Sequence, residues 1–262
     1  MKPKAQFMQV TPDMAREWFQ LSGGNPRGFR KHWAQYLADA LKRGEWLLTH
    51  QGVAISESGV LIDGQHRIWA IMNTGISATL LVVTGVPDES ALVIDRGLKR
   101  TYADVIGISK DEAELPAIAA RYLFATQSPS PQQVKCMADA GMIAIHEKIH
   151  SAYAGKVKTF TAAPMRLAVA YMLMKGHDEK FVLGQYKALA SESINDMTPT
   201  TRLFYKLAKD GKVNVHNYDE TIVRAIRCFD PTETNLKKLY ATDEQKAALR
   251  NDMRDALAAL IK

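Results

Sequence analysis

The feature that most constrains the fold is a change in the spacing of apolar residues near residue 110. Before it, short runs rich in β-branched residues, such as Val53-Ala54-Ile55 and Val60-Leu61-Ile62, alternate with segments of helical periodicity. From Asp111 onward the β-branched runs almost vanish and apolar residues recur at helical spacing. The sequence therefore predicts an α+β protein, with a small mixed sheet in residues 1–108 and an all-helical part in residues 109–262.

Residues 52–84 are expected to form the central unit of the first part. The two runs at 53–55 and 60–62 flank Glu57-Ser58-Gly59 and predict a hairpin, and a helix follows at 65–74. The segment 78–84 is apolar throughout its centre, which predicts an inner strand that is covered on both faces.

Helices are also expected on both sides of this unit. In the first part they are predicted at 12–21, at 29–43 and, after the turn Asp95-Arg96-Gly97, at 101–106. The second of these would bury one apolar stripe, made of Phe29, Trp33, Tyr36, Leu37, Ala40 and Leu41. In the second part helices are predicted at 111–127, 131–152, 163–175, 179–190, 201–209, 219–229, 235–239 and 243–261.

The composition is that of an ordinary folded protein, because 47% of the 262 residues are apolar and 24% are charged. No apolar run approaches the roughly 20 residues of a membrane-spanning helix, and Met1–Gln6 is polar, so we expect a cytoplasmic protein without a membrane partner. A formal net charge of +6 is compatible with a polyanionic partner. Cys136 and Cys228 are expected to be core residues.

The turn Asp63-Gly64-Gln65-His66-Arg67 is the strongest candidate for a binding site. It joins a strand end to a helix start, where backbone N–H groups and the helix dipole attract anions. Glycine permits close backbone approach, and Arg67 offers a fork of donors that can bind phosphate oxygens in pairs. The alternative is a structural turn in which Arg67 pairs with a surface carboxylate.

Residues 7–107 resemble the ParB/sulfiredoxin superfamily, and most closely its phage and bacterial ParB-like proteins with a D-G-Q-H-R motif. The resemblance is carried by Val60-Leu61-Ile62-Asp63-Gly64-Gln65-His66-Arg67-Ile68-Trp69-Ala70 and Leu81-Val82-Val83-Thr84-Gly85, with Thr11-Pro12, Asn25-Pro26, Gly44-Glu45-Trp46 and Arg100-Thr101 in the flanks. It implies a ParB/sulfiredoxin-like first domain that binds ATP or CTP. Activities within the superfamily differ widely, so the resemblance does not select a reaction.

The resemblance also implies roles for individual residues. Gly64, Gln65, His66 and Arg67 would contact the nucleotide phosphates, and Arg30 would face the nucleotide. Asp63 and His66 are the candidate catalytic residues, and Asp63 is the nearest carboxylate for a phosphate-bound Mg²⁺, unless it caps the helix. Arg96 and Arg100 would reach the same phosphates, touch a nucleic-acid backbone or lie in a solvated turn.

Two departures narrow the choice of reaction. Sulfiredoxins resemble this turn but place a reactive cysteine where this chain has Gln65, whose carboxamide cannot act as a thiolate nucleophile. Partition-type ParB proteins follow their first domain with a helix-turn-helix, for which residues 109–262 give no clear pattern. Sulfiredoxin chemistry and a segregation clamp are therefore disfavoured.

Two patterns in the helical part have simpler explanations beside the functional ones. His146-Glu147-Lys148-Ile149-His150 matches the H-E-x-x-H pattern of zinc proteases, but Lys148 is charged and no glutamate between Ser151 and Asp178 supplies a third ligand. We therefore expect an ordinary half-exposed helix, with Ile145 and Ile149 facing the core and Glu147 in solvent. Basic residues near two aromatic rings could contact single-stranded DNA or simply form a wet helix face: Arg202, Phe204, Tyr205, Lys206, Lys209 and Lys212.

Three functions remain open from the sequence. The first is a nucleotide-dependent, DNA-associated ParB-like protein of phage or mobile-element type, with nucleotide hydrolysis or nuclease activity as further options. The second is a nucleotide-dependent kinase or transferase acting on a small molecule or modified base, with the acceptor in the helical part. The third is a nucleotide-free interaction module in which the turn is a relic.

Overall fold

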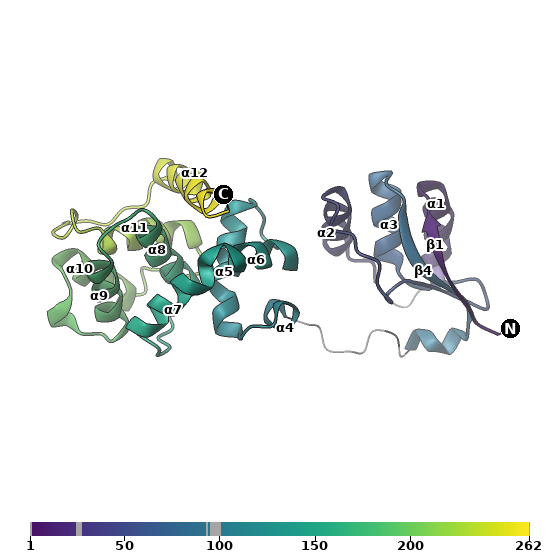
Figure 1. Ribbon diagram of the computed structural model, residues 1–262, viewed down its shortest axis with the longest axis horizontal. Helices are drawn as coiled ribbons and strands as arrows, with labels where there is room; N and C mark the ends of the chain where they lie inside the picture. Colours follow the sequence, from purple (N-terminus) through teal and green to yellow (C-terminus); the bar gives the residue numbers. More distant parts are fainter. Residues whose placement is uncertain (1, 25–27, 93, 95–100, 262) are drawn as a thin grey trace. The chain divides into compact units, whose positions relative to one another are not determined.

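The computed structural model describes residues 2–24, 28–92, 94 and 101–261. The chain divides into two compact units, residues 1–99 and 100–262. The first unit contains a four-stranded mixed sheet and helices, and the elements described in the second unit are all helices (Figure 1). The chain is therefore an α+β protein whose helices lie mostly in its C-terminal part, as the sequence predicts.

The sheet of the first unit has the strand order β1-β4-β2-β3. Strand β4 (Ala78–Val86) is an inner strand, antiparallel to β1 (Lys4–Val10) and parallel to β2 (Val53–Ser56). Strand β2 pairs antiparallel with β3 (Leu61–Asp63) across the predicted hairpin. The hairpin and the inner position of the 78–84 segment are confirmed.

The expectation that β4 is covered on both faces is wrong. Ala78, Leu80 and Val82 are buried, whereas Thr79 is exposed and Leu81 is only half-buried. The core of the unit joins the buried face to three helices, namely α1 (Pro12–Gln20), α2 (Lys31–Lys42) and α3 (Gln65–Thr74). The apolar centre of the segment therefore predicted an inner strand correctly. It did not show whether one or both faces of the strand are buried.

Strand β1 was not predicted. Six of its seven residues are exposed or half-buried and only Val10 is buried. The adjacent apolar residues Phe7 and Met8 interrupt the alternation that identifies a strand. It forms because its backbone pairs along β4 from Lys4 opposite Thr84 to Val10 opposite Ala78. An exposed edge strand is stabilised by such pairing and leaves little trace in hydrophobic periodicity.

Helix α2 buries only part of the predicted stripe, since Leu41 is buried as expected but Phe29 and Trp33 are not. Its buried residues are Ala34, Ala38 and Leu41, while Phe29 just before it is 39% exposed and Trp33 is 46% exposed. The two alanines lie one turn apart on the buried face, where small side chains allow close approach of a neighbouring helix. The larger rings are left at the surface.

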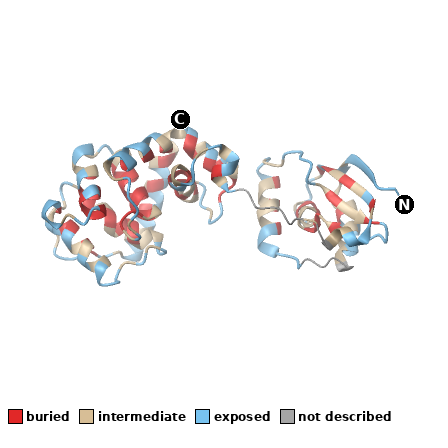
Figure 2. Ribbon diagram, turned by 90° about the horizontal axis from the view of Figure 1, so that it is seen from below, coloured by how far each residue is buried: buried red, intermediate tan, exposed pale blue. Residues whose placement is uncertain are grey.

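The second unit is an assembly of helices of varied length. Its described helices are α4 (Tyr102–Ile106), α5 (Lys110–Leu123), α6 (Pro131–Met137), η3 (Ala138–Met142), α7 (Ile143–Ala152), α8 (Ala163–Met174), α9 (Glu179–Ala190), η4 (Ile194–Asp196), α10 (Pro199–Lys209), α11 (Tyr218–Phe229) and α12 (Asp243–Ala259). Helix α8 is buried from Pro164 to Met172, and Figure 2 shows the buried residues of this unit concentrated in its interior.

The helical part departs from prediction in several places. The segment 131–152 is not one helix, because Gly141 has φ +108° inside the π-helical segment η3 and separates α6 from α7. The predicted helix at 235–239 is absent from the described structure. Helix α4, placed in the first domain by the predicted boundary at 108, lies beyond the end of the first compact unit at Lys99. It contacts α5 and α6, and Tyr102 donates a hydrogen bond to the Pro129 carbonyl at 2.8 Å.

In the second unit the two cysteines differ, since Cys228 is buried and Cys136 is half-buried. Within the described parts of the chain, no helix combines the length and the apolar character that a membrane crossing requires. The predicted turn Asp95-Arg96-Gly97 lies outside the described residues.

Replacing Phe204 by alanine tests the core of the helical unit. Phe204 is fully buried, so we expect Phe204→Ala to lower the free energy of unfolding by about 3–5 kcal/mol. Tyr240→Ala is the matched control, because Tyr240 is 61% exposed and its loss should cost no more than about 0.5 kcal/mol. Urea unfolding followed by circular dichroism measures both, and equal effects would contradict this assignment of the core.

Candidate functional site

Gly64 forms the turn between β3 and α3 in a left-handed conformation, with φ +88° and ψ 7°. A Cβ at this position would lie 2.8 Å from Cγ2 of Val53 and 2.9 Å from the carbonyl oxygen of Gly52. Both the backbone angle and the packing against β2 therefore require glycine. The turn brings the start of α3 against the start of β2.

The acidic residue before this glycine stabilises the turn. Oδ1 of Asp63 accepts a hydrogen bond from the Gly64 N–H at 2.7 Å. Gly64 itself occupies the N-cap position of α3 and has no side chain with which to cap the helix. Asp63 is therefore not the N-cap residue, which was the simpler of its expected roles. Its other expected roles, in catalysis and in holding Mg²⁺, stay predictions.

The ring of His66 is held by two neighbours. Nε2 accepts a hydrogen bond from the backbone N–H of Arg30 at 3.0 Å, and the ring stacks on Phe29 with centroids 5.2 Å apart and an interplanar angle of 13°. Because Nε2 is the acceptor, the proton of the neutral imidazole lies on Nδ1. His66 therefore joins the turn to the start of α2.

Arg67 holds the loop before β2. Its Nη1 donates to the Gly52 carbonyl at 3.2 Å and its Nη2 donates to Oε1 of Gln51 at 3.1 Å. Among the residues that the structure describes, no carboxylate forms an ion pair with Arg67, so the alternative of a surface ion pair is not observed. The guanidinium is instead held by the loop at Gln51 and Gly52.

The remaining predicted site residues differ in their exposure and in whether the structure describes them. Gln65 is buried, so its side chain does not line the surface of the turn. The backbone of Arg30 contacts His66, while its side chain is exposed. Arg96 and Arg100 lie outside the described residues.

Sequence reasoning missed three residues that shape this site. Gln51 and Gly52 orient Arg67, and a Cβ at Gly52 would lie only 1.7 Å from the Leu81 carbonyl oxygen, so glycine is required there as well. Phe29 contacts His66 and also Trp69, at a centroid distance of 5.9 Å. The one feature of the sequence that could have indicated this loop is Gly52, directly before a predicted strand. Close backbone approach is a common reason for glycine at such a position.

The basic and aromatic residues of α10 do not form a stacking surface. Phe204 is buried and Tyr205 stacks on Phe160 at a centroid distance of 5.4 Å. Arg202 donates to the Ile194 carbonyl at 2.9 Å, and Lys209 pairs with a glutamate. Helix α10 therefore fits the simpler alternative, in which a solvent-exposed basic face lies over a core residue. Its basic residues largely form contacts within the unit.

Two hollows of the helical unit are lined by polar side chains. The larger, of about 640 Å³, is lined by polar and basic side chains that include Arg121, His216 and Arg254. In its wall Asp219 accepts hydrogen bonds from the Tyr122 hydroxyl at 2.6 Å and from Nε of Arg250 at 2.7 Å. Burial and the adjacent carboxylate raise the pKa of Tyr122, so this hydroxyl stays a donor. The hollow is suited to an anionic ligand.

The smaller hollow, of about 300 Å³, lies beside Asp111 and Arg166. Nη1 of Arg166 is 3.0 Å from Oδ1 of Asp111. Burial alone would raise the pKa of Asp111, but the hydrogen bond and charge of Arg166 outweigh it and lower this pKa. The carboxylate is therefore ionised at neutral pH.

In the H-E-x-x-H segment nearby, Ile149 is buried, Ile145 is half-buried and Glu147 is exposed, as expected for an ordinary helix face.

The requirement for Gly64 can be tested against a second glycine that borders the same helix. Gly75 ends α3 at φ +72° with no atom within 4 Å of the place a Cβ would take, whereas Gly64 combines a positive φ with close contacts. We expect Gly64→Ala to cost at least about 1 kcal/mol more free energy of unfolding than Gly75→Ala, since only the former adds a clash to backbone strain. Denaturant unfolding of both variants measures the difference, and equal costs would show that β2 does not pack against the turn.

Comparisons of the chain with protein-family models, with curated proteins and with solved structures found no match. The site is therefore interpreted from its own geometry. That geometry is a glycine turn packed against a strand, a helix start whose N-cap residue is glycine, and an arginine fork oriented by a neighbouring loop.

Proposed function

We propose that the first unit is a ParB/sulfiredoxin-like nucleotide-binding module and that the protein acts in association with DNA. The ligand is ATP or CTP, whose phosphates bind at the β3–α3 turn together with Mg²⁺. The observation that carries this proposal is the Gly64 turn, because it opens a ten-residue helix with an N-cap residue that has no side-chain acceptor. Helix starts attract phosphate through their N–H groups and dipole.

Arg67 supports the proposal through its orientation. A guanidinium has five N–H donors, and the bonds to Gln51 and Gly52 use two of them. The same group can therefore remain anchored to the loop while it donates to phosphate oxygens. Such anchoring reduces the side-chain entropy that binding would otherwise cost.

Exposed aromatic rings lie at and just before the start of α2, which the hydrogen bond between Arg30 and His66 joins to this turn. Phe29 stacks on His66, and Trp33 on α2 stacks on Tyr36 with ring centroids 4.9 Å apart. Rings with an accessible face can stack on a nucleotide base. The exposure of Phe29 and Trp33, which the expected apolar stripe did not foresee, is thus consistent with a ligand surface.

DNA association is supported by less direct features. The chain carries a net charge of +6, and basic proteins bind polyanions through counterion release. The transferase alternative gains support from the hollow of the helical unit, where Arg121 and Arg254 could bind an anionic acceptor. The two functions differ in their response to DNA.

Nucleotide binding should raise the melting temperature. At a concentration about 100 times the Kd, a ligand of the folded state adds about 2.7 kcal/mol of stability, which corresponds to a shift of several degrees. We expect such a shift with ATP or CTP plus Mg²⁺ in the parent protein, and its loss in Arg67→Ala. Differential scanning fluorimetry measures each shift against the same variant without nucleotide, because Arg67→Ala also removes the bonds to Gln51 and Gly52.

Arg16→Ala is the control for this experiment. Arg16 lies in the same unit in an exposed ion pair with Asp13, which should contribute little to stability. This variant should keep the full nucleotide shift. The absence of any shift in the parent protein would refute the nucleotide site and favour the interaction module.

DNA binding should be strongly dependent on salt. If the protein neutralises at least two phosphates, its affinity for DNA should fall about tenfold or more between about 50 and 200 mM salt. Fluorescence anisotropy with labelled single-stranded and double-stranded DNA, with and without nucleotide, measures this fall. A protein that does not bind DNA at low salt but is stabilised by nucleotide would instead support the transferase alternative.

A further inference from the structure

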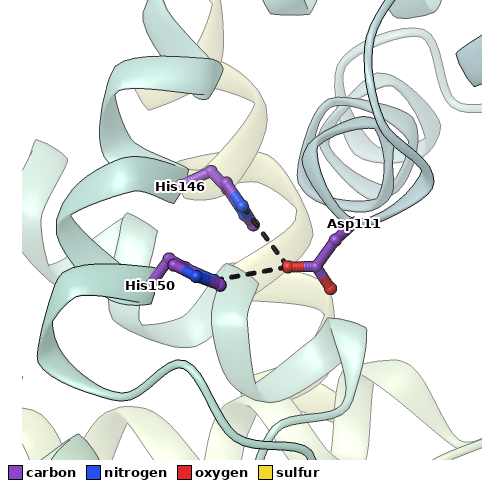
Figure 3. Close-up of side chains that lie close together, drawn as sticks. All are labelled: Asp111, His146 and His150. Atoms are coloured by element: carbon purple, nitrogen blue, oxygen red, sulfur yellow. Dashed lines mark ion pairs between the residues drawn. The ribbon is translucent and has the colours of Figure 1, made fainter.

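Three side chains of the helical unit converge on one point that the proposed nucleotide site does not involve. His146 and His150 lie on α7, and Asp111 lies in the first turn of α5 (Figure 3). Nε2 of His146 and Nδ1 of His150 are each 3.5 Å from the same oxygen, Oδ2 of Asp111. The three atoms all lie within 4.8 Å of one another.

These distances fit a metal shell better than a hydrogen-bonded cluster. A hydrogen bond between nitrogen and oxygen is about 2.7–3.2 Å long, and 3.5 Å is longer. Two ligands of a tetrahedral ion, each about 2.0–2.1 Å from it, are separated by about 3.3–3.4 Å. Both imidazoles point at the carboxylate oxygen across a gap of nearly this size.

The carboxylate is oriented by its other oxygen. Oδ1 of Asp111 accepts a hydrogen bond from Nη1 of Arg166 at 3.0 Å, and the Arg166 side chain is only 7% exposed. Lys156 approaches the same Oδ1, at 4.0 Å. The nearby positive charges thus contact one oxygen, while Oδ2 faces the histidines, as outer-shell partners orient metal-bound carboxylates.

The burial of His146 provides a second, independent observation. Its side chain is 6% exposed, and Nδ1 is buried without a hydrogen-bond partner among the described residues. The polar interactions of this ring therefore depend on Nε2, which faces Asp111. A buried imidazole that makes only a long contact is poorly compensated for its lost hydration, and a coordinated cation at Nε2 would compensate it.

We propose that Asp111, His146 and His150 bind a divalent transition-metal ion, for which Zn²⁺ is the best match, and that the ion links α5 to α7. Two imidazole nitrogens and one carboxylate oxygen form a donor set that zinc accepts, with water in the fourth position. Asp111 supplies the third ligand that the residues after the H-E-x-x-H pattern lack. Glu147 is exposed and Lys148 pairs with Glu179 at 2.6 Å, so the site differs from that of a zinc protease.

The test uses the full chain after removal of metal by a chelator. Isothermal titration calorimetry with ZnCl₂ alone should show one tight equivalent, and Co²⁺ should give the visible absorption of tetrahedral coordination. We expect His150→Ala to bind Zn²⁺ at least about tenfold more weakly, and this variant should fold because His150 is 50% exposed. Asp111→Asn should weaken binding as well, since it removes the anionic ligand.

His216→Ala is the matched control, because His216 is another exposed histidine of the helical unit. It should bind Zn²⁺ as the parent does. Equal binding by the parent and His150→Ala would overturn the proposal and assign the ion to other histidines of the chain. The absence of binding by the metal-free parent would also overturn it. No nucleotide is present, so neither outcome depends on the proposed nucleotide site.

Discussion

The architecture of the first unit depends on one close contact between the Gly64 turn and strand β2. Without a side chain at Gly64, the start of α3 lies against Val53 and Gly52, and Arg67 then reaches the loop that leads into β2. Because β2 pairs with both β3 and β4, a shift of this contact would disturb the sheet and the helix start together. Gly64 therefore contributes both to the stability of the unit and to the geometry of the proposed phosphate site.

The sequence predicted the elements that carry their own periodicity or turn chemistry. The β2–β3 hairpin, helix α3 and inner strand β4 all follow from apolar spacing and from glycine at the turns. Strand β1 could not be predicted, because its residues are mostly exposed and its conformation comes from pairing with β4. The buried face of α2 was predicted only in part, since Leu41 is buried as expected, but Ala34 and Ala38 pack closely while the larger Trp33 stays at the surface.

In the candidate sites, too, groups close in sequence could be predicted, whereas contacts between distant segments could not. Asp63, Gly64 and Arg67 are neighbours in sequence, so their proximity was foreseeable, but the contacts of Arg67 with Gln51 and Gly52 required the fold. The pair of histidines on α7 was visible as a pattern at i and i+4. Asp111 lies 35 residues before His146, and only the packing of α5 against α7 brings its carboxylate to them.

The backbone of the β3–α3 turn is the proposed phosphate site, and amide chemical shifts in a ¹⁵N-labelled protein report on it directly. Titration with ATP or CTP plus Mg²⁺ should perturb the amides of Gly64, Gln65 and His66 more than those of the opposite end of α3, near Gly75. Saturable shifts confined to the start of α3 are the predicted result. Unchanged amides at the turn, or shifts centred on the helical unit, would contradict the proposed site.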